Sequence, residues 1–375
     1  MVRIPRRQIV MGAPAAAATG ALLGVGGPAH AAEGYEEARQ RIWRQGPLQG
    51  LSGAALGREL VRYATLAPSS HNTQCWRFAL NGQGVRIRPD LARRCPVVDP
   101  DDHHLYVSLG CAAENLLQAA AAFGLRGDAH FDAAQGAVQV ALGSASAPAA
   151  AGPLFQAITR RQSTRGDYDG RPLSAAELDQ LARAARSPAV DLLLLTERPA
   201  MEQVLDFVLQ GNSAQLADPA FVAELKAWIR FSESDAVARG DGLFARSSGN
   251  PALPDWLGRR LFDFVFTTGS ENDKYARQLR SSAGVAVFVA TGDAGTDPRA
   301  RWVTVGRAFE RFALQATTLG IRTAHLNMPV EVAAIRPRFA QALGLGAQRP
   351  DLVVRFGRGP ALPPSLRRPV QAVLD

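Results

Sequence analysis

An internal repeat constrains the fold of this chain more than any other feature of its sequence. Val107, Gly110, Ala112, Glu114, Ala120 and Gly124 recur 196 positions later as Val303, Gly306, Ala308, Glu310, Ala316 and Gly320. Two Ala-rich helices can agree by composition alone, but glycines in register at both ends argue against chance. A repeat on this scale is typical of one structural unit that occurs twice. We therefore expect two copies of one α+β unit fused in a single chain.

A low-complexity segment separates the two copies. Residues 144–152 are rich in Ala, Ser and Pro, which is the composition of a linker. Each copy combines a long helix with short strand patterns, at 77–80, 85–88, 128–131 and 138–142 in the first and at 285–290, 323–327 and 353–357 in the second. Asn81-Gly82 predicts a hairpin between the first two. We place the first unit at residues 32–150 and the second at 151–375.

The long helix of the first copy has clear start and stop signals. The cluster from Asp99 to Asp102 offers side-chain oxygens that can cap a helix N-terminus, and Gly124 follows the last helical residue, Phe123. The His103-His104 pair then falls at the helix start, which explains it better than a metal site does.

A polar turn follows an earlier helical pattern that runs from Leu56 to Leu66. Pro68 ends that helix, because a proline inside it would lose a hydrogen bond and clash with the preceding turn. Residues 67–78 read A-P-S-S-H-N-T-Q-C-W-R-F, and the alternation at their end predicts a strand. Asn and Gln each offer a donor and an acceptor, which suits the edge of a planar heterocycle. The other interpretation is a turn whose Ser and Asn side chains bond their own backbone.

A second polar motif, R-R-Q-S-T-R, stands at residues 160–165. Three arginines and a serine within six residues can hold a dianionic phosphate, because a guanidinium binds phosphate oxygens in pairs. The other interpretation is an exposed basic turn near a helix start.

These motifs resemble those of the nitroreductase superfamily. The Ser-Ser-x-Asn-x-Gln turn is similar to the family's flavin-contacting turn, although the family usually has Pro where this chain has Cys75. Residues 161–165 resemble the Arg-x-Ser-x-Arg/Lys motif that ends the family's first helix. Residues 328–331 are similar to its Pro-x-Glu loop, and Arg367 stands where the family has a C-terminal phosphate-binding arginine.

The resemblance implies that the chain binds FMN and transfers two electrons. It implies that Arg161, Ser163 and Arg367 meet the flavin phosphate and that Arg165 lies near the N1/O2 edge, where a cation stabilises the reduced flavin. The loop at Glu331 would face N5 through backbone N–H groups. The flavin-contacting turn would contribute Ser69, Ser70, Asn72 and Gln74.

The distribution of the motifs between the halves indicates one flavin site rather than two. The first half has only the turn, and the second half has only the arginine motif. Where a second turn should follow its helix, residues 186–188 lead directly into the apolar run 190–195. This division resembles the fused, Acg-like branch of the superfamily. We expect a pseudo-dimer within one chain, which can exist as a monomer.

Residues 200–280 have no counterpart in the first half. They contain a helical pattern at 221–230, a loop-rich stretch at 240–254 and an aromatic run at 256–266. The resemblance implies a helical lid over the flavin, and a peripheral helical insertion is the alternative.

The N-terminal 31 residues are typical of an export signal. Arg6 and Arg7 form a twin arginine before a weakly apolar run, and the small residues Ala29 and Ala31 precede an expected cleavage site. We therefore expect extracytoplasmic localisation by the twin-arginine route, which exports folded proteins. The apolar run is too short and too rich in glycine to span a membrane.

Composition excludes several function classes. The formal net charge is +8, but the arginines are scattered and alternate with acidic residues, so we expect no nucleic-acid partner. The three cysteines lack metal-type spacing, and we predict neither a metal site nor a disulfide framework. No catalytic side chain can be named from the sequence.

Three functions remain. The first is an FMN-dependent oxidoreductase that reduces nitro, quinone or enone-type small molecules with NAD(P)H or another donor. The second is an exported FMN-sequestering protein with little turnover, because a lid would cover the cofactor and an exported protein meets no ready pool of NAD(P)H. The third is a small-ligand module without flavin.

Overall fold

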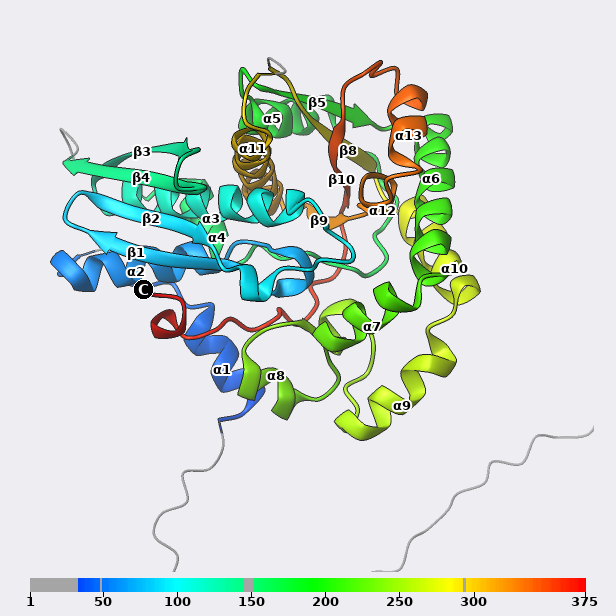
Figure 1. Cartoon of the computed structure of the whole chain (residues 1–375), viewed down its shortest axis with the longest axis horizontal. Helices are drawn as coiled ribbons and strands as arrows, with labels where there is room; N and C mark the ends of the chain where they lie inside the picture. The colour runs from blue at the N-terminus through cyan, green and yellow to red at the C-terminus, as the bar shows by residue number, and fades with distance from the viewer. Residues whose placement is uncertain (1–32, 48, 145–150, 293–294) are drawn as a thin grey trace, which may run out of the picture. The chain divides into compact units, whose positions relative to one another are not determined.

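Two four-stranded antiparallel sheets form the framework of the part of the chain that the structure describes (Figure 1). The computed structural model describes residues 33–47, 49–144, 151–292 and 295–375. Of these, residues 34–375 belong to one compact unit. The predicted leader and most of the predicted linker lie outside the described residues, so both stay predictions.

The first sheet has the strand order β1-β2-β4-β3. Its strands are β1 (Trp76–Asn81), β2 (Gly84–Pro89), β3 (Leu125–Asp132) and β4 (Ala137–Ser144). Asn81 pairs with Gly84, so the hairpin is confirmed, with Gly82 and Gln83 as its two loop residues. The side chain of Asn81 closes this turn by accepting from the Gln83 N–H at 3.0 Å.

The second sheet repeats this arrangement with the order β5-β8-β10-β9. Its strands are β5 (Val190–Leu195), β8 (Gly284–Ala290), β9 (Arg322–His325) and β10 (Pro350–Gly357). All pairings in both sheets are antiparallel. When the strands are counted within each sheet in chain order, the two orders are the same. The long helix follows the second strand in each case.

The two long helices, α3 (His103–Ala122) and α11 (Pro298–Thr318), pack against each other at glycines. A Cβ added at Gly110 would collide with the carbonyl oxygen of Val303, and one added at Gly306 would collide with the carbonyl oxygen of Val107. The contact is reciprocal, as it is across a two-fold axis. Side chains of both helices and both sheets share one hydrophobic core.

The predicted glycine at the C-terminal end of α3 is confirmed, and the predicted N-terminal cap is confirmed for one of the aspartates. Gly124 and Gly320 follow the two long helices with φ of 75° and 70°, a conformation that glycine adopts without strain. Asp102 does not cap α3 with its side chain. Asp99 does so instead, because its carboxylate accepts from the N–H groups of His104 at 3.0 Å and Leu105 at 2.9 Å.

The remaining helices outside the insertion cover the sheets. These helices are α1 (Tyr35–Ile42), α2 (Gly53–Thr65), α4 (Pro153–Ile158), α5 (Ala175–Ala185), α12 (Met328–Glu331) and α13 (Arg336–Ala342), with short 3-10 turns η1 (Ser70–Asn72), η2 (Leu91–Arg93) and η4 (Val370–Ala372). As predicted, α2 ends at Thr65, before Pro68.

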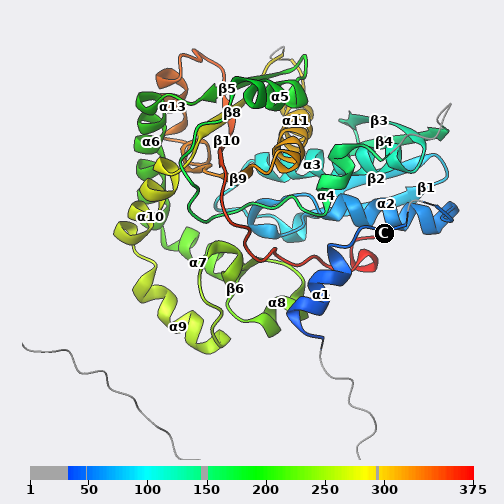
Figure 2. The same ribbon diagram turned by 180° about the vertical axis from the view of Figure 1, so that it is seen from behind.

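The C-terminal segment returns from the second sheet to the first (Figure 2). After β10 it runs past α1, and Phe78 of β1 donates its N–H to the carbonyl of Val373 at 2.8 Å and accepts from the Asp375 N–H at 2.9 Å. This return places Arg367 beside the end of α2, a segment that is distant from Arg367 in the sequence.

The predicted insertion is helical and divides into two parts. It contains α6 (Arg198–Leu216), α7 (Pro219–Trp228), α8 (Glu233–Arg239), α9 (Asp255–Val265) and α10 (Thr268–Arg280), with the short β6 (Ile229–Arg230), β7 (Leu243–Phe244) and η3 (Ala245–Ser248). Apolar side chains of α6 and α10 pack on one face of the second sheet. The part from α7 to α9 lies at the bottom of the view in Figure 1, where α8 contacts α1. Among the described residues, no helix combines the length and apolar character that crossing a bilayer requires.

Candidate functional site

The polar turn between α2 and β1 has an unusual backbone. His71, Asn72 and Gln74 have φ values of 47°, 53° and 54°, in the left-handed region that non-glycine residues rarely occupy. Such conformations cost free energy and persist only where surrounding contacts enforce them, and they concentrate at functional sites.

Asn72 and Gln74 supply those contacts. The Asn72 amide donates to the carbonyls of Gly242 at 2.9 Å and Leu366 at 3.1 Å. The Gln74 amide donates to the Gly240 carbonyl at 2.8 Å and accepts from the Arg368 N–H at 2.9 Å. Both side chains therefore clamp the turn between the insertion and the C-terminal segment. Ser69 and Ser70, by contrast, line a cavity beside the turn.

The main cavity has a volume of about 200 Å³ and is built from three parts of the chain. The first half supplies the turn and the N-terminal part of α3, the second half supplies β9, α12 and residues near Arg165, and the insertion supplies α6, α7 and Phe266. Apolar groups form much of its wall, including Val107, Phe309 and Leu352, while serine, histidine and amide side chains form its polar edge. A cavity with apolar walls and a few polar groups is typical of a small-molecule site.

A smaller cavity of about 50 Å³ shares Ser69, Ser163 and Arg165 with the main one. Its distinguishing feature is positive charge, because Arg161 and Arg367 also line it. Arg161 comes from the segment after α4, and Arg367 comes from the C-terminal return. The main cavity is thus an apolar chamber, and the smaller cavity is a basic pocket that shares part of the chamber's lining.

The three guanidinium groups are only partly compensated. Arg161 Nε lies 3.2 Å from Glu310 Oε1, and both side chains are buried. Arg367 donates to the carbonyls of Thr65, Leu66 and Ala67 at the C-terminus of α2, at 2.7–3.2 Å. Among the described residues, neither Arg165 nor Arg367 has a carboxylate within ion-pair distance.

Burial dominates the pKa shifts of these groups, and the charge of Arg161 modifies them. Burial and then the like charge of Arg161 lower the pKa of Arg367 to about 9. Burial raises the pKa of Glu310 to about 7, against the opposing attraction of Arg161, so this carboxyl is partly protonated at neutral pH. Nη1 of Arg161 has no hydrogen-bond partner in the part of the chain that the structure describes. A buried cation without a counter-ion is unfavourable, and a bound anion would stabilise this pocket.

A carboxyl and an imidazole face the main cavity from the opposite side. Glu331 Oε1 lies 3.6 Å from His104 Nδ1, and Glu331 Oε2 accepts from the Gln215 amide at 2.7 Å. Burial raises the pKa of Glu331. Burial lowers the pKa of His71 to about 4 and that of His325 to about 3, so these two cavity histidines are neutral at physiological pH. Burial favours the neutral form of each group, which for the Glu331 carboxyl is the protonated form and for the two histidines is the deprotonated form.

The structure brings together most of the residues that the sequence singled out. Eight of the nine line one or both cavities: Ser69, Ser70, Asn72, Arg161, Ser163, Arg165, Glu331 and Arg367. Gln74 does not, because its side chain is buried in contacts with the backbone. Asn72 lines the smaller cavity, but its amide nitrogen is occupied by two carbonyls, and its oxygen has no partner.

Other cavity residues gave no clear signal in the sequence. The insertion contributes Asn212, Gln215 and Tyr275. The helix α3 adds His104, and the strand β9 adds His325. His104 was assigned to a helix start, which is confirmed, and that position also points it to the cavity. Tertiary packing brings the start of α3 beside the polar turn, and local residue patterns do not show this proximity.

Comparison with known proteins assigns the class of this chain. The family model for the nitroreductase family matches residues 158–358, more than half of the chain. The chain therefore belongs to the nitroreductase family, whose members are oxidoreductases, and has an α+β nitroreductase-like fold. The match covers the arginine motif and residues 328–331, whereas the polar turn precedes it.

Two curated proteins of Mycobacterium tuberculosis are similar to this chain over most of its length. Both carry the provisional name NAD(P)H nitroreductase, Rv3131 in strain H37Rv and MT3217 in strain CDC 1551. Each is 27% identical over 337 residues, which covers 85% of this chain and 90% of the relative.

Solved structures of the family show a more remote similarity. A nitroreductase-like protein from Bacillus cereus is 13% identical, with 59% of this chain and 94% of that chain covered and a TM-score of 0.36. The FMN-dependent nitroreductase NfnB from Mycobacterium smegmatis in complex with NADPH is 11% identical, with 55% and 87% covered and a TM-score of 0.36. Family membership is established by the sequence match.

Proposed function

We propose that this chain is an FMN-dependent oxidoreductase that uses NAD(P)H to reduce nitro, quinone or enone-type small molecules by two electrons. The observation that carries the proposal is the pocket of three arginines with one partly protonated carboxyl, which opens into an apolar chamber. An FMN molecule has the same two parts, a phosphate and a planar ring system. The names of the two mycobacterial relatives support NAD(P)H as the donor.

The residues of both cavities fit FMN. Arg161 and Arg367 are the groups that would hold the phosphate, because within the described part of the chain Nη1 of Arg161 is unpartnered and no carboxylate pairs with Arg367. Ser163 lies between the cavities and would contact the chain that links phosphate and ring. Ser69, Ser70 and Arg165 would face the ring edge. When bound, FMN supplies the capacity to accept and donate two electrons.

The protein's own groups have three roles in this proposal. The strained turn fixes Ser69 and Ser70 in place before a ligand arrives, which reduces the cost of ordering them. Apolar residues of the insertion, Phe221 and Leu225, exclude water from the chamber. The Glu331 carboxyl, whose pKa is raised by burial, lies at the cavity edge with His104 as its neighbour and is our candidate for proton delivery.

We further propose that the chain is a tandem fusion, of the Acg-like kind, that forms its pseudo-dimer internally. The shared strand order of the two sheets and the reciprocal glycine contact between α3 and α11 support this proposal. So does the position of the site, because the turn comes from the first half and the arginines come from the second. The proposal predicts one flavin per chain and a monomer in solution.

The alternative function is an exported FMN-sequestering protein. The observation that favours it is the insertion, which contributes a wall of the chamber and clamps the turn through the carbonyls of Gly240 and Gly242. Export by the twin-arginine route is also our proposal, supported by Arg6 and Arg7 in a typical leader. Replacing both by Lys should keep the chain in the cytoplasm, and unchanged export would refute that route.

Anaerobic reduction of the purified flavoprotein distinguishes an enzyme from a store. In an enzyme, NAD(P)H or a synthetic reductant bleaches the flavin, and a nitro, quinone or enone acceptor restores its absorbance over many turnovers. A chain that is reduced but reoxidised by none of these acceptors, even after α7–α9 is shortened, is a store. The Glu331→Gln variant is the matched test of proton delivery, because it retains the hydrogen bond to Gln215 while losing the titratable proton.

A further inference from the structure

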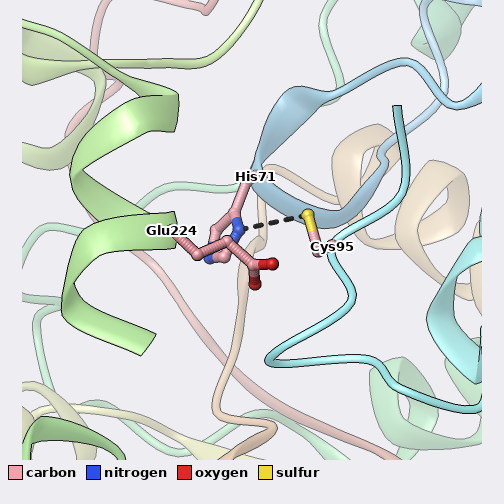
Figure 3. Close-up of side chains that lie close together, drawn as sticks. All are labelled: His71, Cys95 and Glu224. Atoms are coloured by element: carbon pink, nitrogen blue, oxygen red, sulfur yellow. Dashed lines mark hydrogen bonds between the residues drawn. The ribbon is translucent and has the colours of Figure 1, made fainter. Parts of the chain in front are cut away.

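A histidine, a cysteine and a glutamate lie close together (Figure 3), and the histidine lines the main cavity. His71 comes from the polar turn, Cys95 from the loop after η2, and Glu224 from α7 of the insertion. One donor atom of each lies within 4.8 Å of the other two, and His71 Nδ1 is 3.5 Å from Cys95 Sγ. Cys95 is buried, whereas His71 and Glu224 are half-buried.

The Glu224 carboxylate is held in place by the backbone. Its Oε2 accepts from the Val97 N–H and its Oε1 accepts from the Val98 N–H, both at 3.0 Å. Each oxygen keeps a further lone pair, since a carboxylate has about four acceptor sites. Backbone donors that orient a carboxylate in this way are typical of the outer contacts around metal ligands.

A small apolar cluster surrounds the three side chains. Cys95, Val98 and Phe221 form a core separate from the main one, and Leu225 and Trp228 pack against it. The cluster fixes α7 against the loop that carries Cys95. The ligand atoms are therefore pre-positioned by packing, and the site does not depend on exposed, flexible side chains.

Hydrogen bonding explains part of this arrangement but not all of it. A bond between His71 and Cys95 accounts for two of the three groups, and the capping of Val97 and Val98 accounts for the carboxylate. Among the described residues, no hydrogen bond joins the carboxylate to the sulfur or to the imidazole, although the three groups lie within 4.8 Å of one another. A nitrogen, a sulfur and an oxygen ligand that converge in this way match the donor set of Zn²⁺.

We propose that His71, Cys95 and Glu224 bind a Zn²⁺ ion. On binding, the Cys95 thiol releases its proton to solvent, and the thiolate and carboxylate together balance the two positive charges of the ion. Three protein ligands leave a fourth position, which water fills from the adjacent cavity. The spacing of the cysteines gave no sign of this site, because its ligands are contributed by three distant segments.

The ion would tie the insertion to the polar turn. His71 lies between Ser70 and Asn72, and Glu224 belongs to the helix whose residues line the chamber. Zn²⁺ would thus hold α7 closed over the cavity and restrain the turn. Because ion binding favours the folded state, saturating Zn²⁺ should raise the thermal midpoint of unfolding.

The test uses the untagged, purified chain, freed of metal by a chelator that is then removed by dialysis. Calorimetric titration with Zn²⁺ should give one equivalent per chain. Titration with Co²⁺ should give the intense long-wavelength bands of a four-coordinate ion, which lie beyond flavin absorption. The flavin content of the sample therefore does not affect the readout, and failure here leaves the proposed oxidoreductase function intact.

Three ligand variants and one control complete the test. His71→Asn suits a position with positive φ, and Cys95→Ser and Glu224→Gln keep the size of each side chain. Each should lower Zn²⁺ affinity by at least about tenfold, the lower limit for losing even an outer contact of a metal site. Cys75→Ser, at a buried cysteine outside the cluster, should bind Zn²⁺ as the unmodified chain does.

The outcomes are decisive in either direction. Absence of saturable Zn²⁺ binding, or binding that Cys95→Ser leaves unchanged, would overturn the proposal. If a variant fails to fold, the Co²⁺ spectrum of the unmodified chain decides. Four-coordinate bands support the site, and the spectrum of hydrated Co²⁺ refutes it.

Discussion

Glu114 and Glu310 occupy equivalent positions on α3 and α11 but have different surroundings. Glu114 pairs with two arginines, Arg307 at 3.2 Å and Arg311 at 3.0 Å. Glu310 pairs with Arg161 alone at 3.2 Å, deep in the basic pocket. Asn115 stands at the position that corresponds to Arg311, and a rotation of its amide lets it donate to Glu310 at 2.9 Å.

The comparison shows how one helix pair can serve structure at one end and function at the other. Two arginines neutralise Glu114, so its end of the pair is a closed ion-pair network. Cys111 and Asn115 stand at the positions that correspond to Arg307 and Arg311, so neither arginine has a counterpart beside Glu310. The cation that pairs with Glu310 is Arg161, from the segment after α4, and it is shared with the cavity. The difference lies in these two pairs of matching positions, and it leaves Arg161 able to bind an anion.

The largest expected effect tests the equivalence of the two helices themselves. Gly110→Ala and Gly306→Ala should each lower the free energy of unfolding by about 3 kcal/mol or more, the upper range for overpacking, because backbone atoms obstruct the new methyl group. Urea denaturation measures both. Gly269→Ala, in a helix with open space around the residue, should be neutral or slightly stabilising. Tolerance of alanine at either of the two contact glycines would break the comparison.

The next effect concerns pH and separates the two carboxyls. An unfolded glutamate releases its proton near 4.5, whereas folded Glu310 keeps it up to about 7. The folded chain therefore binds more protons in this interval, and its free energy of unfolding should fall as pH rises from 4.5 to 7. The upper limit is on the order of 3 kcal/mol, because each pKa unit corresponds to about 1.4 kcal/mol.

Glu310→Gln should remove this contribution, and Glu114→Gln should retain it. Denaturation curves at several pH values between 4.5 and 7.5 supply the measurement. An identical pH dependence in Glu310→Gln and the unmodified chain would show that Glu310 does not titrate as its surroundings imply.

The smallest expected change is in the free energy of FMN binding, and it is the change most specific to the basic pocket. Arg161→Ala should weaken FMN binding about 10- to 100-fold, because a hydrogen bond to a charged group contributes about 1.5–3 kcal/mol. Arg307→Ala removes a cation from Glu114 instead and should leave FMN affinity unchanged. Arg160→Ala, at an exposed neighbour of Arg161, is a second control. Equal losses in the three variants would point to a general charge effect.

Local patterns predicted most elements of this fold, and the reasons are visible in particular residues. Pro68 and Gly124 end helices for steric reasons that act within a few residues, and Asn81-Gly82 marks a hairpin in the same way. The cap of α3 was predicted less well because Asp99, Asp101 and Asp102 all offer a carboxylate. Which of them reaches the helix N–H groups depends on how the preceding loop folds.

The candidate site could be predicted only where its residues form contiguous motifs. Ser69, Ser70, Ser163 and Arg165 reach the cavity as expected, whereas Gln74 bonds to the insertion and the C-terminal segment, neither of which is near it in sequence. The pairing of Arg161 with Glu310 joins positions 149 residues apart (310 − 161), and nothing local marks Glu310 as its partner. Contacts of this kind follow from tertiary packing.

The central claim is that one site, completed by both halves, recognises the phosphate of one FMN. Equilibrium titration of the flavin-free chain with FMN and with riboflavin, which lacks the phosphate, tests it most directly. We predict one equivalent of FMN per chain, much weaker binding of riboflavin, and loss of that preference in Arg161→Ala. Two equivalents of FMN, or equal affinity for the two flavins, would contradict the account.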